Sequence, residues 1–413
     1  MINFKKEVFI IVGISVLLLP MVSAYFDTKL ISVIPVMLLI FIALYLFLTS
    51  NKKILVPRFL IWPLTLAIIA SIISSLLEKI SHLGLILVML QALLMYYAFQ
   101  YYKNIEVKKI YNYLKIIYIC ILIISIIDWV FILTRNQEYL VSLFNAESVT
   151  KYKNYNSATL LQFITNNGGY TGANGPTLGS QGLSQLLLCG IIFFNPYLNK
   201  NFNLIFFILV IVYLLSASMT TSIFIFFIFL ILFFKFMKNN FSINKIIILF
   251  IIIYFIEDLL SLVFFRLNKF EDIFEYYDAY FRFDELINID TSSLLFGMEY
   301  GNNYTGSDFG YLSIILSGGV LYFLFFLYFQ IFVCFLGYKC YKFIDVFEVQ
   351  NDKSFLDWSV LGFLSSLASL MFFWGLIHYT ASIELGGTQL YSLCIALTCT
   401  AYTKIYNFKN RFL

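Results

Sequence analysis

Apolar runs of Ile, Leu, Phe and Val recur along nearly the whole chain and are separated by short polar connections. Twelve of these runs approach the roughly 20 residues that an α-helix needs to cross a bilayer. They cover residues 8–25, 30–49, 59–77, 83–102, 111–134, 176–195, 203–218, 220–237, 243–264, 309–336, 356–376 and 386–403. The pattern predicts an all-α, polytopic integral membrane protein with about 12 transmembrane helices, built as a single transmembrane domain over residues 1–413.

The composition supports a membrane protein and excludes several classes of function. The 413 residues are 61% hydrophobic and only 12% charged, which is too apolar for a soluble protein of this length. The chain has no P-loop and no soluble domain long enough for a sugar-nucleotide fold, and we expect no nucleic acid partner. Its six cysteines form no CxxC and it has only two histidines, so we expect no disulfide, no metal site and no cofactor.

The distribution of Lys and Arg predicts how the chain crosses the membrane. With a cytoplasmic N-terminus, nineteen of the 27 cations fall on the cytoplasmic side, as the positive-inside rule requires. The eight that fall outside are Lys29, Lys79, Arg135, Lys151, Lys153, Arg266, Lys269 and Arg282. The opposite orientation fits the rule badly. We therefore expect both termini in the cytoplasm.

Two long outer loops carry most of the polar residues expected on that side. The first, residues 135–175, ends in a stretch rich in Gly and Asn that is typical of turns. The second, residues 266–308, contains nine carboxylates. Its apolar residues recur at helical spacing: Phe270, Ile273, Phe274, Tyr277 and Phe281. They predict an amphipathic helix on the membrane surface. The alternative is a solvated acidic loop that only connects two helices.

Four residues outside the apolar segments are candidates for chemistry. Arg282 follows Asp278 by four residues, so it either forms an ion pair within a helix or clamps a diphosphate with its guanidinium. Asp308 either caps the helix that begins after it or serves as a base or acceptor for a sugar hydroxyl. Glu299 lies between these two residues, and His378 is a lone outer histidine, a residue more often found at an interface than in catalysis.

Three short motifs resemble those of the O-antigen polymerase (Wzy) family, which shares its core with the O-antigen ligases. The first two resemble a Gly/Pro/Asn helix start and a Ser-x-Ser turn, and the third resembles a run of Arg, Leu-Phe-Gly, Asp or His, and Gly. The segments that carry them are Gly172 to Pro176 with Gly182-Leu183, then Leu215 to Ser218, then Arg282 with Leu295-Phe296-Gly297, Ser307 to Tyr311 and Gly318-Gly319. Together they span roughly residues 170 to 325.

The chain departs from the family pattern in two places. The family often has Arg directly after Ser-x-Ser, where this chain has Met219. The family also often has Arg shortly before the Gly/Pro/Asn helix start, where this chain has none. An essential cation in the first large loop would therefore have to be Arg135, Lys151 or Lys153.

The resemblance implies a GT-C-like glycosyltransferase of the bacterial inner membrane with a periplasmic active site. An undecaprenyl-diphosphate-linked oligosaccharide would be both donor and acceptor, with membrane lipids and a chain-length regulator protein as further partners. The diphosphate would be bound by Arg282, Arg266 and Arg135, and Arg282 would stabilise the charge that develops on it. The attacking hydroxyl would be oriented or deprotonated by Asp308, Glu299 or His378.

Two other functions remain open at the level of the sequence. An O-antigen ligase performs the same chemistry but transfers the glycan to lipid A core, and Asp308 favours the polymerase because ligases more often have His there. A lipid-linked oligosaccharide flippase or other transporter would place charged residues inside its helices and would show symmetry between its halves. In this chain, the charge of the outer loops dominates instead.

Overall fold

The computed structural model describes residues 4–19, 33–49, 58–79, 84–101, 106–133, 180–195, 203–216, 289–298, 310–349, 352–376 and 387–412. Of these residues 94% are helical, and none of them lies in a β-strand. The predicted all-α fold is thus confirmed for the part of the chain that the structure describes.

Ten of the twelve predicted apolar segments coincide with helices. The helices are α1 (Phe4–Leu17), α3 (Val33–Thr49), α4 (Arg58–Leu76), α5 (Gly84–Tyr101), α6 (Val107–Leu133), α10 (Ser180–Phe193), α11 (Asn203–Ser216), α17 (Gly310–Val349), α18 (Lys353–Gly375) and α19 (Gly387–Phe412). A further short helix, α16 (Thr291–Phe296), lies within residues 266–308, the predicted second outer loop. The predicted segments 220–237 and 243–264 lie outside the described residues.

Within the part of the chain that the structure describes, four helices are long and apolar enough to cross a membrane. They comprise Gly84–Tyr101, Val107–Ile127, Gly310–Phe347 and Lys353–Gly375. Four shorter apolar helices lie within α3, α4, α10 and α11. Large apolar side chains such as Phe41, Phe47 and Leu48 are exposed on α3. A lipid environment would cover this surface, because exposing so much apolar area to water costs free energy. These features give the chain the character of a multi-pass membrane protein.

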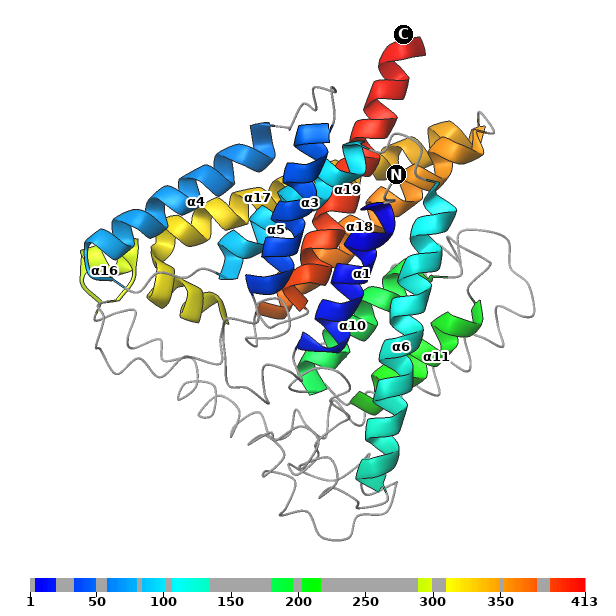
Figure 1. Cartoon of the computed structure of the whole chain (residues 1–413), viewed down its shortest axis with the longest axis horizontal. Helices are drawn as coiled ribbons and strands as arrows, with labels where there is room; N and C mark the ends of the chain where they lie inside the picture. Colours follow the sequence, from blue (N-terminus) through cyan, green and yellow to red (C-terminus); the bar gives the residue numbers. More distant parts are fainter. Residues whose placement is uncertain are drawn as a thin grey trace.

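Helix α19 forms the centre of the bundle. It packs against α18, α5, α17 and α1, and Figure 1 shows it running between these helices. All its residues from Gly387 to Ala401 are buried. A helix that is buried on every face needs apolar or small residues all round, and this stretch supplies Leu, Ala, Cys, Ser and Thr. α1 begins and α19 ends on the same side of the bundle (Figure 1).

A buried polar network joins three helices in this core. The hydroxyl of Tyr391 on α19 donates to Oε1 of Gln330 on α17 at 2.7 Å. Nε2 of Gln330 donates to Oγ of Ser369 on α18 at 3.1 Å. Because an apolar interior offers no water as a substitute partner, these hydrogen bonds favour one packing of the three helices.

Helix α17 differs from the predicted segment 309–336 in length and in shape. It continues to Val349, and a kink at Gly319 divides it in two. The extension includes Lys339 and Lys342, whose ammonium groups lie 5.0 Å and 4.8 Å from the ring centroids of Phe335 and Tyr338. Each ring lies one helical turn before its lysine, so the cation–π contacts support a helical backbone. The charges of these lysines alone had predicted a non-helical connection between two apolar segments.

Candidate functional site

The six site residues predicted from the sequence all lie outside the described residues. They are Arg282, Asp308, Glu299, His378, Arg266 and Arg135. The first outer loop and the proposed amphipathic stripe also lie outside them. Each of these assignments therefore stays a prediction. The structure does describe one part of the predicted second outer loop, residues 289–298, together with the elements that hold it.

Helix α16 is built from local capping interactions. The carboxylate of Asp290 caps it by accepting a hydrogen bond from the backbone N–H of Ser293 at 3.0 Å. At its other end, Gly297 adopts φ 99° and donates its N–H to the carbonyl of Ser293 at 2.8 Å. Hydrogen bonds from Ser293, and then from Ser292, lower the pKa of Asp290, and the charge of Lys79 lowers it further. The carboxylate therefore remains an anion at neutral pH.

A buried lysine connects this short helix to α4. Lys79 follows the end of α4 and is only 3% exposed. Its Nζ donates to Oγ of Ser293 at 2.9 Å. One turn earlier, Ser74 Oγ donates to the carbonyl of Phe296. Two side chains from the end of α4 thus hold both ends of α16, and one of them brings a positive charge into the junction.

The kink of α17 lies on the other side of α16. Gly319 has φ 84°, and a Cβ atom at this position would meet the carbonyl oxygen of Leu295. The backbone N–H of Met298 donates to the carbonyl of Leu316 at 2.7 Å. α16 therefore lies between the end of α4 and the bend of α17, as Figure 1 shows at the left of the bundle. We call this arrangement the α4–α16–α17 junction.

The junction brings together two segments that only a family resemblance connects in the sequence. Leu295-Phe296-Gly297 and Gly318-Gly319 are about twenty residues apart in the chain, yet the Gly319 backbone lies against the peptide between Leu295 and Phe296. Glu299 is the next residue after Met298 in the sequence, and Asp308 precedes Gly310 by two residues. The chain between the two segments thus carries two of the predicted site residues.

Lys79 is a polar residue of this junction that no sequence pattern singles out. In the sequence it counts only as one of the eight cations expected on the outer side. A signal was present, since Glu78-Lys79 ends the segment and the next helix begins at Gly84. Glu78 has a positive φ of 56°, which is uncommon for a residue other than glycine and marks a tight turn. The sequence could not indicate that the lysine turns inward.

The part of the chain that the structure describes contains no group of three or more His, Cys, Asp or Glu residues that could hold a metal ion. The polar groups of the junction are instead one ammonium, one carboxylate and several hydroxyls. Such groups bind anions and sugar hydroxyls through charge and hydrogen bonds. No family model, no curated protein and no solved structure matches this chain.

Proposed function

We propose that this protein is an O-antigen polymerase of GT-C-like architecture, with about 12 membrane spans, in the bacterial inner membrane. It joins undecaprenyl-diphosphate-linked repeat units at the periplasmic face, and both of its termini are cytoplasmic. The observation that supports this proposal most is the α4–α16–α17 junction. Two segments contact each other there, Leu295-Phe296-Gly297 and Gly318-Gly319. Both belong to the third motif that resembles the O-antigen polymerase family. A shared structural element is what one functional motif would require.

The proposed reaction is a glycosyl transfer between two lipid-linked substrates. The hydroxyl oxygen of the acceptor repeat unit bonds to the anomeric carbon of the donor glycan. The bond from that carbon to the diphosphate oxygen breaks, and the diphosphate leaves with the electron pair. The hydroxyl proton passes to a base, for which Asp308, Glu299 and His378 are the candidates. The products are the elongated lipid-linked glycan and undecaprenyl diphosphate.

The negative charge on the leaving diphosphate would be stabilised by arginine. Arg282, Arg266 and Arg135 are the candidates, because a guanidinium forms paired hydrogen bonds with phosphate oxygens. In this scheme the junction fixes the C-terminal end of the loop that carries Arg282 and Arg266. Lys79 then contributes by holding Ser293 at 2.9 Å. Positioning of this kind matters because small displacements of catalytic groups lower rates strongly.

The surface glycan of a deletion strain tests this proposal. A polymerase is supported if the strain loses the ladder of long chains and retains surface lipid with one repeat unit. Loss of all surface glycan would instead indicate a ligase or a flippase. Purified protein mixed with lipid-linked repeat units distinguishes a polymerase from a ligase or a flippase. Only a polymerase produces a ladder of glycan lengths from that substrate alone. Absence of a ladder from folded protein would overturn the proposal.

A further inference from the structure

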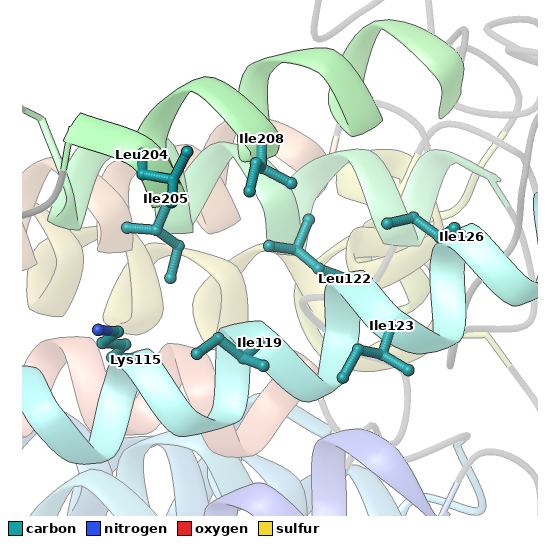
Figure 2. Close-up of a pocket in the computed structure, with 8 residues that line it drawn as sticks. All are labelled: Lys115, Ile119, Leu122, Ile123, Ile126, Leu204, Ile205 and Ile208. Atoms are coloured by element: carbon teal, nitrogen blue, oxygen red, sulfur yellow. The ribbon is translucent and has the colours of Figure 1, made fainter.

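An apolar groove runs between α6 and α11, away from the α4–α16–α17 junction. It has a volume of about 370 Å³. Its walls are formed by Lys115, Ile119, Leu122, Ile123, Ile126, Leu204, Ile205 and Ile208 (Figure 2). Seven of these eight residues are Ile or Leu, so the groove offers almost no hydrogen-bonding groups. Such a lining fits a hydrocarbon chain.

The groove is open at the outer surface of the helix bundle. Ile123 is 52% exposed and Leu204 is 76% exposed, whereas Ile205 is buried and lies deeper. In a membrane protein such an exposed apolar surface contacts lipid. Along α6 the lining residues from Lys115 to Ile126 cover about 16 Å at 1.5 Å per residue. That length matches one leaflet, which is about half of the 30 Å hydrocarbon core.

The charge at one end of the groove identifies the kind of lipid. Lys115 is the only charged residue in the lining, and Figure 2 shows its amine beside the apolar side chains at one end of the groove. It follows Lys108 and Lys109 on the first turns of α6, on the side that the positive-inside rule assigns to the cytoplasm. A cation at the mouth of a hydrocarbon groove complements a lipid with an anionic headgroup.

We propose that this groove binds one acyl chain of an anionic phospholipid from the cytoplasmic leaflet, with the lipid phosphate against Lys115. The phosphate oxygens accept charge-assisted hydrogen bonds from the ammonium group. The acyl chain lies along Ile119, Ile123 and Ile126. This site is independent of the proposed glycosyl transfer, because the predicted topology places the two at opposite membrane faces.

Native mass spectrometry of the full-length protein in mild detergent tests the site, with phosphatidylglycerol and phosphatidylcholine as probes. Wild-type protein should bind phosphatidylglycerol in preference. Lys115→Gln should weaken phosphatidylglycerol binding roughly tenfold and leave phosphatidylcholine binding unchanged, because it removes the positive charge and keeps a polar side chain. Lys342→Gln, which also removes an exposed charge but on α17, is the matched control and should bind like wild type.

A second pair of variants tests the apolar part of the site. Ile123→Trp fills the groove and should reduce the occupancy of both lipids at least severalfold. Ile116→Trp is its control, because Ile116 is 60% exposed on the same helix but does not line the groove. Size-exclusion profiles and thermal unfolding establish that all four variants are folded.

A photoactivatable phosphatidylglycerol that carries the reactive group on its acyl chain then locates the lipid. Cross-links to peptides containing residues 115–126 or 204–208 support the site. Three outcomes would overturn the proposal. The first is unchanged lipid binding in both Lys115→Gln and Ile123→Trp. The second is labelling confined to other helices. The third is a wild-type protein that binds no lipid, which would mean that another segment of the chain or a second copy covers the groove.

Discussion

Lys79 donates a hydrogen bond to Ser293 across 2.9 Å, although the two residues are 214 positions apart in the chain. The contact joins the end of α4 to a helix of only six residues. A helix this short is not stable alone. The conformational entropy lost when its first turn forms outweighs the free energy gained from its few hydrogen bonds. The conformation of residues 289–298 therefore depends on contacts with the end of α4 and with the kink of α17.

Replacement of Lys79 should loosen α16. Lys79→Met keeps much of the buried volume but removes the donor to Ser293, which should destabilise the junction by about 1–3 kcal/mol. Amide hydrogen exchange of the peptide containing residues 289–298 should become at least tenfold faster. Lys342→Met, which changes an exposed lysine on α17, should leave that exchange rate unchanged. Equal protection in Lys79→Met and wild type would show that the lysine does not hold the helix.

Replacement of Gly319 should distort the kink of α17. The residue has φ 84°, and a Cβ atom would meet the carbonyl of Leu295, so Gly319→Ala combines backbone strain with a clash. We expect a loss of about 1–3 kcal/mol in stability and, under the proposed function, shorter glycan chains.

Gly13→Ala on α1 is the matched control for Gly319. A Cβ atom there would lie 3.4 Å from Cγ1 of Ile117, an ordinary contact, and alanine favours a helix. Thermal unfolding in detergent should therefore separate the two variants. Unfolding temperatures that are equal for Gly319→Ala and wild type would contradict a strained kink.

Replacement of Arg282 distinguishes a diphosphate clamp from a surface ion pair. An exposed pair with Asp278 is worth under about 1 kcal/mol, so its loss predicts a mild phenotype. Loss of a group that stabilises developing charge commonly lowers the rate about a hundredfold or more. We expect Arg282→Ala to abolish nearly all polymer, and Arg282→Lys to remain strongly impaired because it loses the forked geometry. The measurement is glycan chain length on gels at matched protein levels.

Wild-type chain lengths in both Arg282 variants would remove this arginine from the proposed mechanism. The search for the diphosphate-binding cation would then move to Arg266 and Arg135. Lys79 would be a weaker candidate for that role, because it is buried and donates to Ser293.

The predicted topology can be tested by labelling with an impermeant thiol reagent in intact cells. Cysteines introduced at Asn154 and Asn302 should react from outside, since both belong to the predicted outer loops. A cysteine at Asn51 should react only after the cells are opened. The unmodified chain provides the background from its six native cysteines. Labelling at Asn51 in intact cells would reverse the orientation.

The sequence determined the positions of the helices because each apolar run must satisfy its backbone hydrogen bonds within itself in a lipid environment. Ten predicted segments therefore coincide with helices, although several helices begin or end at other residues than predicted. The ends are less predictable since they depend on caps and on neighbours. The extension of α17 to Val349 is an example, because contacts of Lys339 and Lys342 with preceding rings favour a helix where charge alone predicted a connection.

Only the tertiary structure decided which polar residues meet. Lys79 and Ser293 carry no pattern that relates them, and the contact of Gly319 with Leu295 depends on a backbone angle rather than on a spacing. Hydrophobic periodicity reports which side of a helix avoids water, but it does not report which helix lies opposite. The apolar runs thus defined the helices, whereas the buried cation of the junction became visible only once α4, α16 and α17 were placed together.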